Sequence, residues 1–120
     1  HPPGGVRRRP FRRSAGLTEP TGVLTVADRT PLTNDERAAL AIRLPGWQVD
    51  GDHLRRSWAF TDFAEAFAFM TQVADVAEAL QHHPDWSNSW NRVEIALTTH
   101  SAGGLTHLDL AFAEAVDALF

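Results

Sequence analysis

Residues 62–86 read DFAEAFAFMTQVADVAEALQHHPDW, and this stretch decides the fold. Asp62 and Glu65 have the spacing of a capping box, which predicts a helix that begins here and reaches about Gln81. Pro84 stops the pattern, because proline has no backbone N–H and clashes with the preceding turn. Apolar residues recur at helical spacing in two stripes: Phe63, Phe67, Met70, Ala74 and Ala77, and Phe69, Val73, Val76 and Leu80. Since one buried face needs only one stripe, we expect one to cover a sheet and the other to meet a partner subunit.

On the N-terminal side of this helix, the sequence predicts a shorter helix and a hairpin. Thr33 and Glu36 form a second capping box, and Pro45-Gly46 ends the helix that it opens. Trp47 and Val49 then alternate with polar neighbours as far as Asp50-Gly51, a strong hairpin-turn dipeptide. The second strand of the hairpin carries one face of Leu54, Arg56, Trp58 and Phe60.

On the C-terminal side, a second hairpin and a last helix follow. The third strand alternates through Trp86, Asn88 and Trp90, and Asn91-Arg92 is the predicted turn. The fourth strand alternates Val93, Ile95, Leu97 and Thr99 with Glu94, Ala96, Thr98 and His100. Thr106 caps the last helix. The order α-β-β-α-β-β-α predicts an α+β domain over residues 32–120, a four-stranded antiparallel sheet with three helices packed on one face.

Residues 1–31 differ from this domain in composition. Residues 1–30 hold six arginines against Glu19 and Asp28, a net charge of +4, together with a Pro-Pro-Gly-Gly run. Such a stretch buries too little apolar surface to offset the entropy of ordering, so we expect a disordered basic tail. Two interpretations stay open: a phosphate-binding arm, or chain upstream of the native start, since position 1 is not methionine.

The composition of the domain narrows its function. Residues 31–120 hold five arginines against thirteen acids, a net charge of −8, which argues against nucleic-acid binding by the core. The chain has no cysteine, which excludes disulfides, thiolate metal sites and cysteine nucleophiles. No apolar run approaches the roughly 20 residues that span a bilayer, and the arginines are not followed by a secretory h-region. We therefore expect no membrane contact and a cytoplasmic location.

Three histidines are the candidate chemical groups. His82 and His83 stand where the long helix ends against Pro84, and His100 stands at the end of the fourth strand. Histidine both gives and takes protons near neutral pH, because its ordinary pKa is about 6.5. Imidazoles that converge beside tryptophan suit a planar heteroaromatic substrate whose reaction is proton transfer alone. The sequence holds no phosphate loop, dinucleotide fingerprint or nucleophile elbow.

The pattern Glu78-x3-His82-His83-Pro84-x5-Trp90-x9-His100-x8-Asp109 resembles, element by element, the signature of the pterin-4a-carbinolamine dehydratase family. The resemblance covers about residues 32–120 and includes Gly46-Trp47 and the run Phe60-x-Asp62-Phe63-x-x-Ala66-Phe67-x-Phe69-Met70. The chain departs from the family in its basic tail and in polar Ser87 and Ser89.

The resemblance implies dehydration of 4a-hydroxytetrahydropterin to quinonoid dihydropterin, which recycles the tetrahydrobiopterin cofactor of aromatic amino-acid hydroxylases. It implies a hydro-lyase without metal or cofactor that forms a homodimer or homotetramer through the long helix. Carried over by position, His82, His83 and His100 are the catalytic imidazoles. We expect His83 and His100 to exchange protons and His82 to orient the pterin. The expected substrate-binding residues are Glu78, Pro84, Trp86, Trp90 and Asp109.

Plainer interpretations exist for most of these residues. His82 and His83 would also suit a helix C-terminus, where imidazolium is favourable, and His100 could be a solvated strand residue. A three-histidine zinc site is a further alternative. Asp109 stands three residues after Thr106, so capping the last helix fits it at least as well as substrate contact. Glu78 would either orient His82, four residues on, or face water.

One alternative concerns the whole protein. Relatives in this family act as transcriptional coactivators or RuBisCO assembly factors, so the scaffold could serve binding or assembly instead of catalysis. The active-site pattern is degraded in the assembly-factor branch, whereas all three histidines stand in this chain. The sequence therefore favours the enzyme.

Overall fold

The computed structural model describes residues 28–120, so most of the predicted basic tail, residues 1–27, lies outside the described residues. In chain order the elements are α2 (Asn34–Arg43), β1 (Gln48–Asp50), β2 (His53–Ala59), α3 (Phe63–Leu80), β3 (Asp85–Ser89), β4 (Arg92–Leu97), the 3-10 helix η2 (His100–Ala102) and α4 (His107–Asp117). Three α-helices and four strands in this order confirm the predicted α+β fold.

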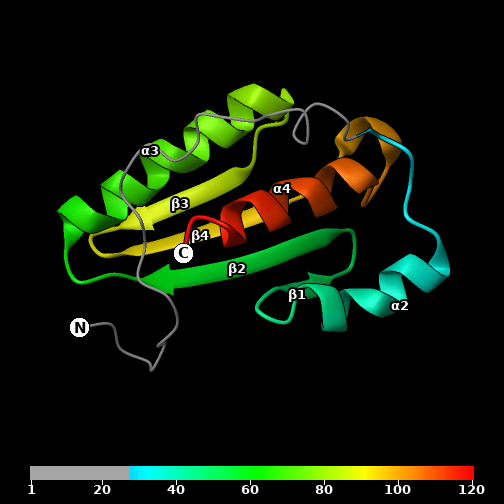
Figure 1. Ribbon diagram of the computed structural model, residues 1–120, viewed down its shortest axis with the longest axis horizontal. Helices are drawn as coiled ribbons and strands as arrows, with labels where there is room; N and C mark the ends of the chain where they lie inside the picture. Colours follow the sequence, from blue (N-terminus) through cyan, green and yellow to red (C-terminus); the bar gives the residue numbers. More distant parts are fainter. Residues whose placement is uncertain (1–27) are drawn as a thin grey trace.

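The four strands form one antiparallel sheet in the order β1-β2-β4-β3. β2 and β4 are therefore the inner strands, and β1 and β3 are the edges. Figure 1 shows α3 and α4 running along the sheet, while α2 lies beyond the β1 end. The end of the sheet where β3 begins and β4 finishes also receives the C-terminus of α3 and the N-terminus of α4.

The core lies between the sheet and the two long helices. One stripe of α3 faces inward, since Phe69, Val73 and Val76 are at most 1% exposed. These side chains share a single apolar cluster with Leu54, Ile95 and Leu97 of the inner strands and Phe112 and Val116 of α4. Each such side chain stabilises the fold by about 1.5–3 kcal/mol on burial, so this cluster fixes α3 and α4 over the sheet.

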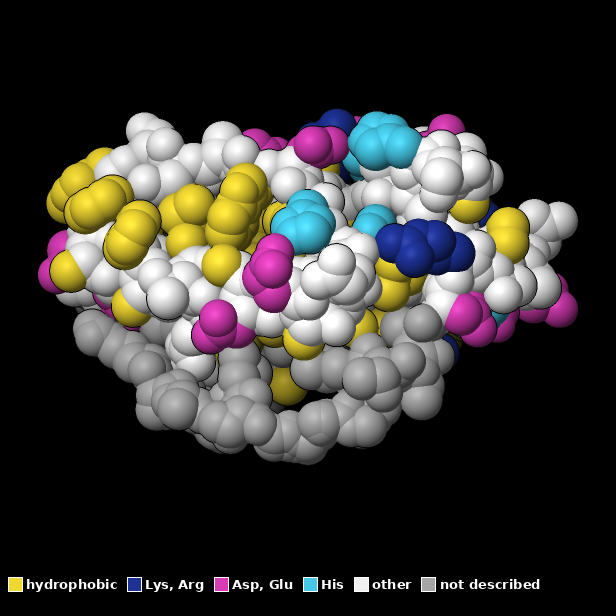
Figure 2. Space-filling view, turned by 90° about the horizontal axis from the view of Figure 1, so that it is seen from above, with side chains coloured by type: hydrophobic (Ala, Val, Ile, Leu, Met, Phe, Trp, Pro, Cys, Tyr) yellow, Lys and Arg dark blue, Asp and Glu magenta, His cyan; other side chains and the backbone are white. Residues whose placement is uncertain are grey.

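The other stripe of α3 is only partly on the surface, because Ala77 is 3% exposed and belongs to the core and Met70 packs against it. Phe63 is 46% and Phe67 56% exposed, and their rings lie 5.8 Å apart. Figure 2, which looks down on the α3 side of the molecule, shows hydrophobic side chains gathered into a patch there. Within residues 28–120, no helix is both long enough and apolar enough to cross a membrane.

The capping predictions are confirmed at two helices and corrected at the third. Thr33 with Glu36 closes a complete capping box at α2, and Thr106 with Asp109 closes one at α4. At α3, the Asp62 carboxylate accepts from the N–H of Glu65, but the Glu65 carboxylate accepts from the N–H of Thr61, one residue earlier than in a capping box.

Both hairpin turns lie one residue away from their predicted positions. The first is formed by Gly51 and Asp52, with Gly51 at φ 61°, where a glycine adopts the left-handed conformation without steric cost. The second is formed by Trp90 and Asn91, so the prediction that Trp90 belongs to the third strand is wrong. Asn91 is held there because its side chain donates to Phe60 O and its own carbonyl accepts from the N–H of Phe60.

Candidate active site

The end of α3 sends two adjacent histidines in different directions. Gln81, just after the helix, is left-handed at φ 53° and ψ 45°. The N–H of His82 then donates to Ala77 O at 3.0 Å, the six-residue hydrogen bond of a Schellman ending. As a result, the side chain of His82 is only 8% exposed, whereas that of His83 is 60% exposed.

His82 is paired with a buried carboxylate on the neighbouring helix. Its Nε2 lies 2.6 Å from Asp109 Oδ1, and Asp109 is fully buried. The second oxygen of Asp109 accepts from the hydroxyl of Thr99 at 2.8 Å and from the N–H of Thr106 at 2.9 Å. Asp109 therefore caps α4, as one of its two interpretations holds, and it also holds His82; the structure shows no surface of this residue for the other interpretation, substrate contact.

These contacts set the proton positions on the His82 ring. An ionised Asp109 only accepts hydrogen bonds, so the Nε2 of His82 carries a proton and donates. The proton on Nε2 leaves Nδ1 as the nitrogen that can exchange a proton with a bound molecule. The edge of the ring also packs against Phe112, with the centroids 6.0 Å apart and the planes at 77°, which limits its rotation. The contact with Asp109 and the packing against Phe112 thus hold His82 in one orientation, and an ionised Asp109 would favour one tautomer, the role a buried carboxylate has beside many catalytic histidines.

His83 forms a second pair, in solvent. Its Nε2 lies 2.7 Å from Glu78 Oε2, and the side chain of Glu78 is 71% exposed. Of the two interpretations of Glu78, the structure therefore does not show the one in which it orients His82; the side chain faces water and contacts His83. Because α3 ends at Leu80 and the chain reverses at Gln81, His82 no longer follows Glu78 on one helix face, and His83 takes that place.

His100 is the third candidate histidine, and it follows strand β4 instead of helix α3. β4 ends at Leu97, so the prediction that His100 is a strand residue is wrong, and it begins η2 instead. Its side chain is 81% exposed, and its Nε2 lies 3.9 Å from Asp85 Oδ2. Asp85 comes two residues after His83, and Thr99, next to His100, reaches Asp109. The three histidines therefore gather at one end of the sheet, and Figure 2 shows histidine and acidic side chains together on this face.

Of the remaining predicted substrate-binding residues, two lie near the histidines and one lies far from them. Pro84 is half-buried between His83 and Asp85, and Trp86, 37% exposed, is the second residue of β3. Trp90 lies at the opposite end of the hairpin, five residues after Asp85, or roughly 16 Å at strand spacing. It is 64% exposed with a positive φ of 52°. The structure does not bring Trp90 to the histidines of its own chain.

No three His, Asp or Glu side chains within residues 28–120 are grouped so that they could hold a metal ion. The arrangement instead offers three imidazoles, each with one carboxylate partner. Such a set can take and give protons around one bound molecule without another reactive group.

The comparisons with known proteins agree with this arrangement. Residues 30–119 match the family described as pterin 4 alpha carbinolamine dehydratase. The chain belongs to this family.

Among the relatives of this pterin dehydratase family member, one from Synechococcus sp. (strain WH7803) is 58% identical over 88 residues, which cover 73% of this chain and 95% of the relative. One from Rhizorhabdus wittichii is 58% identical over 91 residues, which cover 74% and 94%. Both carry provisional names as pterin-4-alpha-carbinolamine dehydratases.

Two solved structures are also similar. A transcriptional coactivator/pterin dehydratase from Brucella melitensis matches with a TM-score of 0.70 and 46% identity, over 75% of this chain and 98% of that one. A pterin dehydratase-like protein described as a RuBisCO assembly factor in the alpha-carboxysome matches with a TM-score of 0.51 and 30% identity, over 61% and 84%.

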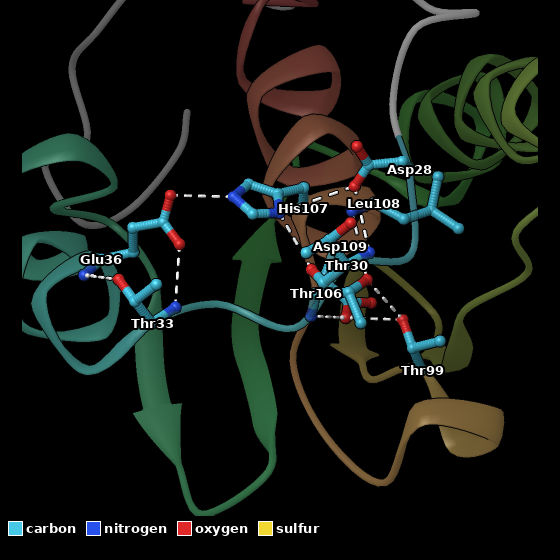
Figure 3. A network of polar contacts seen from close by, with 9 residues as sticks. All are labelled: Asp28, Thr30, Thr33, Glu36, Thr99, Thr106, His107, Leu108 and Asp109. Carbon is cyan, nitrogen blue, oxygen red and sulfur yellow. Dashed lines mark hydrogen bonds and ion pairs between the residues drawn. The ribbon is translucent and has the colours of Figure 1, made fainter.

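In this pterin dehydratase family member, three residues near the site escaped the sequence interpretation. Thr99 had a usable signal, because a polar residue in the inward phase of a strand needs a hydrogen-bond partner. Arg29, which lies in the predicted tail, donates from Nη2 to Gln81 O at 3.1 Å. His107 lies in a polar network that joins residues 28–36 to the start of α4 (Figure 3). Neither of these two had a local signal, because both partners are distant in sequence.

The ring of His107 has acceptors at both nitrogens. Nδ1 lies 2.9 Å from Thr30 O, and Nε2 lies 2.8 Å from Glu36 Oε2. The hydrogen bond with Glu36 raises the pKa of His107, and the Thr30 carbonyl adds to this. The backbone N–H of Thr33, and then His107, lower the pKa of Glu36. Both shifts act in favour of a doubly protonated His107 that faces an ionised Glu36.

Proposed function

We propose that the protein catalyses the dehydration of 4a-hydroxytetrahydropterin to quinonoid dihydropterin. The observation that carries the proposal is the gathering of His82, His83 and His100 at one end of the sheet, each beside one carboxylate. Membership in the pterin dehydratase family supports the same reaction class.

The reaction asks for two proton transfers and nothing else. The C4a–O bond breaks and the oxygen leaves as water, so an acid must protonate it. The ring nitrogen N5 loses its proton to a base, and its electron pair forms the C4a=N5 double bond. Imidazoles suit both tasks at neutral pH, since they are populated in both protonation states.

The two exposed histidines are the proton-transfer partners in this proposal. Glu78 lies against one nitrogen of His83 and Asp85 lies nearest to Nε2 of His100, which leaves Nδ1 of each ring for the substrate. His82 is the orienting group, because the Asp109 contact fixes its ring and only Nδ1 remains to meet the pterin. Pro84 and Trp86 stand beside these groups and would border the ring. Trp90 could contact a pterin only from another protomer.

The biological setting proposed is tetrahydrobiopterin recycling after aromatic amino-acid hydroxylation, in the cytoplasm. The natural pterin would be the 4a-hydroxy product of such a hydroxylase. This setting rests on the family and on the reaction chemistry.

A stopped-flow assay with freshly generated 4a-hydroxytetrahydropterin tests the activity. Wild-type protein should accelerate formation of the quinonoid product over the spontaneous rate. His83→Ala and His100→Ala should lose most of that acceleration, while His53→Ala, a half-buried histidine on β2 outside the cluster, should keep it. Wild-type protein that leaves the spontaneous rate unchanged would overturn the proposal.

A role in binding or assembly is the second candidate. It is supported by the similar structures described as a transcriptional coactivator/pterin dehydratase and as a RuBisCO assembly factor. The same assay separates the two, because a scaffold protein would be inactive whether or not its histidines were intact.

We further propose a homodimer or homotetramer formed through the exposed stripe of α3. Phe63 and Phe67 present two large aromatic rings to solvent on one helix, which is typical of a contact surface. Sedimentation at micromolar concentration should give a dimer or tetramer, and Phe67→Glu should shift it toward monomer. A wild-type monomer would contradict this.

A further inference from the structure

Residues 28–31 form a short segment, here called the strap, that contacts both the end of α3 and the start of α4. At one end, the guanidinium of Arg29 donates to Gln81 O at 3.1 Å. At the other, Thr30 O accepts from the backbone N–H of His107 at 3.0 Å and from its Nδ1–H at 2.9 Å. Pro31 pairs with Thr106 as an isolated β-bridge, and Asp28 accepts from the N–H of Thr30 at 3.0 Å (Figure 3).

The strap therefore touches both elements that build the buried pair. Gln81 O belongs to the same rigid peptide unit as the N–H of His82. The N–H of that unit is fixed by Ala77 O, and the oxygen is fixed by Arg29. On the other side, His107 lies between Thr106 and Asp109 in the first turn of α4. One segment thus links the turn that carries His82 to the helix start that carries Asp109.

We propose that Arg29 and His107 are positioning residues that hold His82 against Asp109 through the strap. The inference rests on the proposed function, since it assigns them to the same reaction. Arg29 does not need to touch the pterin in this proposal. It fixes the plane of the Gln81–His82 peptide, and the contact between His82 Nε2 and Asp109 Oδ1 depends on that plane.

His107 holds the strap most strongly when it is charged. Two charged groups face it: Glu36 of α2, with Oε2 2.8 Å from Nε2, and Asp28 of the strap, with Oδ1 3.6 Å from Nδ1. A neutral His107 keeps one proton, and the Glu36 carboxylate favours keeping it on Nε2, so Nδ1 would turn a lone pair toward Thr30 O and lose that hydrogen bond. The strap should therefore loosen at alkaline pH and in His107→Asn.

Arg29→Met tests the proposal, with Arg37→Met as its matched control. Arg37 also donates from Nη2 to a backbone carbonyl on the surface, Gly51 O at 3.0 Å, in the first hairpin turn and not in the peptide unit that carries His82. Arg29→Met should lower kcat about fivefold, the factor that one hydrogen bond contributes, with KM unchanged. Arg37→Met should leave kcat unchanged, and Arg29→Lys, which keeps a cation within reach of the carbonyl, should restore most of the loss.

Two further measurements distinguish positioning from a general structural role. In a His82→Ala background, Arg29→Met should have no added effect on the residual rate, because its target is gone. Long-range ¹H–¹⁵N spectra should show the Nε2-protonated tautomer of His82 in the wild type and less of it in Arg29→Met and His107→Asn. Arg43→Met, which breaks the other ion pair between α2 and α4 (2.7 Å from Glu114), should leave the spectrum unchanged.

Three outcomes would overturn the inference. Arg29→Met could behave like Arg37→Met, or its loss in kcat could persist undiminished without His82, or the His82 spectrum could be the same in all variants. The spectra need no activity, so they decide the role of the strap even if the wild-type protein fails to dehydrate the pterin.

Discussion

His82 and His83 are neighbours in the chain, and each ring lies within hydrogen-bond distance of one carboxylate, at 2.6 and 2.7 Å. The two pairs differ almost only in their surroundings. The His82–Asp109 side chains are 8% and 0% exposed, whereas the His83–Glu78 side chains are 60% and 71% exposed. Equal distances therefore do not imply equal energies, because water screens one pair and supplies alternative partners to its members. The buried pair fixes a ring, and the exposed pair leaves a ring able to move and exchange protons.

Asp109→Ala should break the comparison most strongly. It leaves His82 Nε2, the Thr99 hydroxyl and the Thr106 N–H without their shared acceptor, so we expect a loss of about 3–5 kcal/mol in the free energy of unfolding. Glu78→Ala should cost at most about 1 kcal/mol, as for other surface pairs. Urea denaturation of both variants measures the difference. Equal losses would mean that burial does not separate the two pairs.

Alanine at the histidines themselves should separate activity from stability. His83→Ala should lower kcat by about 100-fold, the lower range for a lost general acid or base, while unfolding changes by less than about 0.5 kcal/mol. His82→Ala should lower both, since it also strands buried Asp109. Steady-state assays and thermal melts on the same preparations test this. A stable, fully active His82→Ala would contradict the assigned roles.

The Glu36–His107 pair sharpens the comparison, because its side chains are 39% and 32% exposed and so lie between the other two. Its contribution has a defined pH window. Since the pKa of His107 is raised from 6.5, its contribution to the free energy of unfolding is fully present below pH 6.5. This contribution is lost as the pH rises through the folded-state pKa of His107. Since the pKa of Glu36 is lowered from 4.5, the contribution of Glu36 to the free energy of unfolding is fully present above pH 4.5 and is lost on acidification. The pair should stabilise most between these values.

Glu36→Gln is the variant that tests this window. Glutamine can still close the capping box with Thr33, so only the charge is removed. Stability of the wild type should fall relative to Glu36→Gln as the pH rises above 6.5 and His107 loses its proton. A difference between the two proteins that does not change over this range would refute the prediction.

The smallest expected effect is the dependence on salt concentration of the stability that each of the two pairs contributes. Glu78→Gln should lower stability by a few tenths of a kcal/mol in low salt and by nothing measurable in 1 M KCl, where charges are screened beyond about 3 Å. The loss caused by Asp109→Ala should hardly change between the two conditions. Denaturation of both variants in both buffers measures these losses. An equal response to salt would mean that solvent screens both pairs to the same extent.

The sequence predicted what depends on local signals. The capping boxes at Thr33 and Thr106 and the two stripes of α3 gave the helices and their orientation, and strand alternation gave the sheet. The turns were each misplaced by one residue, because their position depends on cross-strand pairing. Ser89 pairs with Arg92, and the hydrogen bonds between Asn91 and Phe60 add a constraint that lies 31 residues away.

The site was predicted in composition but not in pairing. All three histidines lie at one end of the sheet, yet Glu78 pairs with His83 instead of His82, because the left-handed Gln81 ends the helical spacing two residues before His83. Arg29 and His107 could not be found locally, since each depends on a partner more than 50 residues away. Their signal exists only once the chain is folded.

Because the chain reverses at Gln81, the two adjacent histidines His82 and His83 also differ in chemical reactivity. His83 stands in water, and the ring nitrogen that Glu78 does not face can meet an external electrophile, whereas His82 has one nitrogen against Asp109 and most of its ring inside the protein. An acylating reagent such as diethyl pyrocarbonate should therefore mark His83 long before His82. Adjacent positions along the backbone thus become chemically separable, which allows His83 to be blocked while His82 stays unmodified.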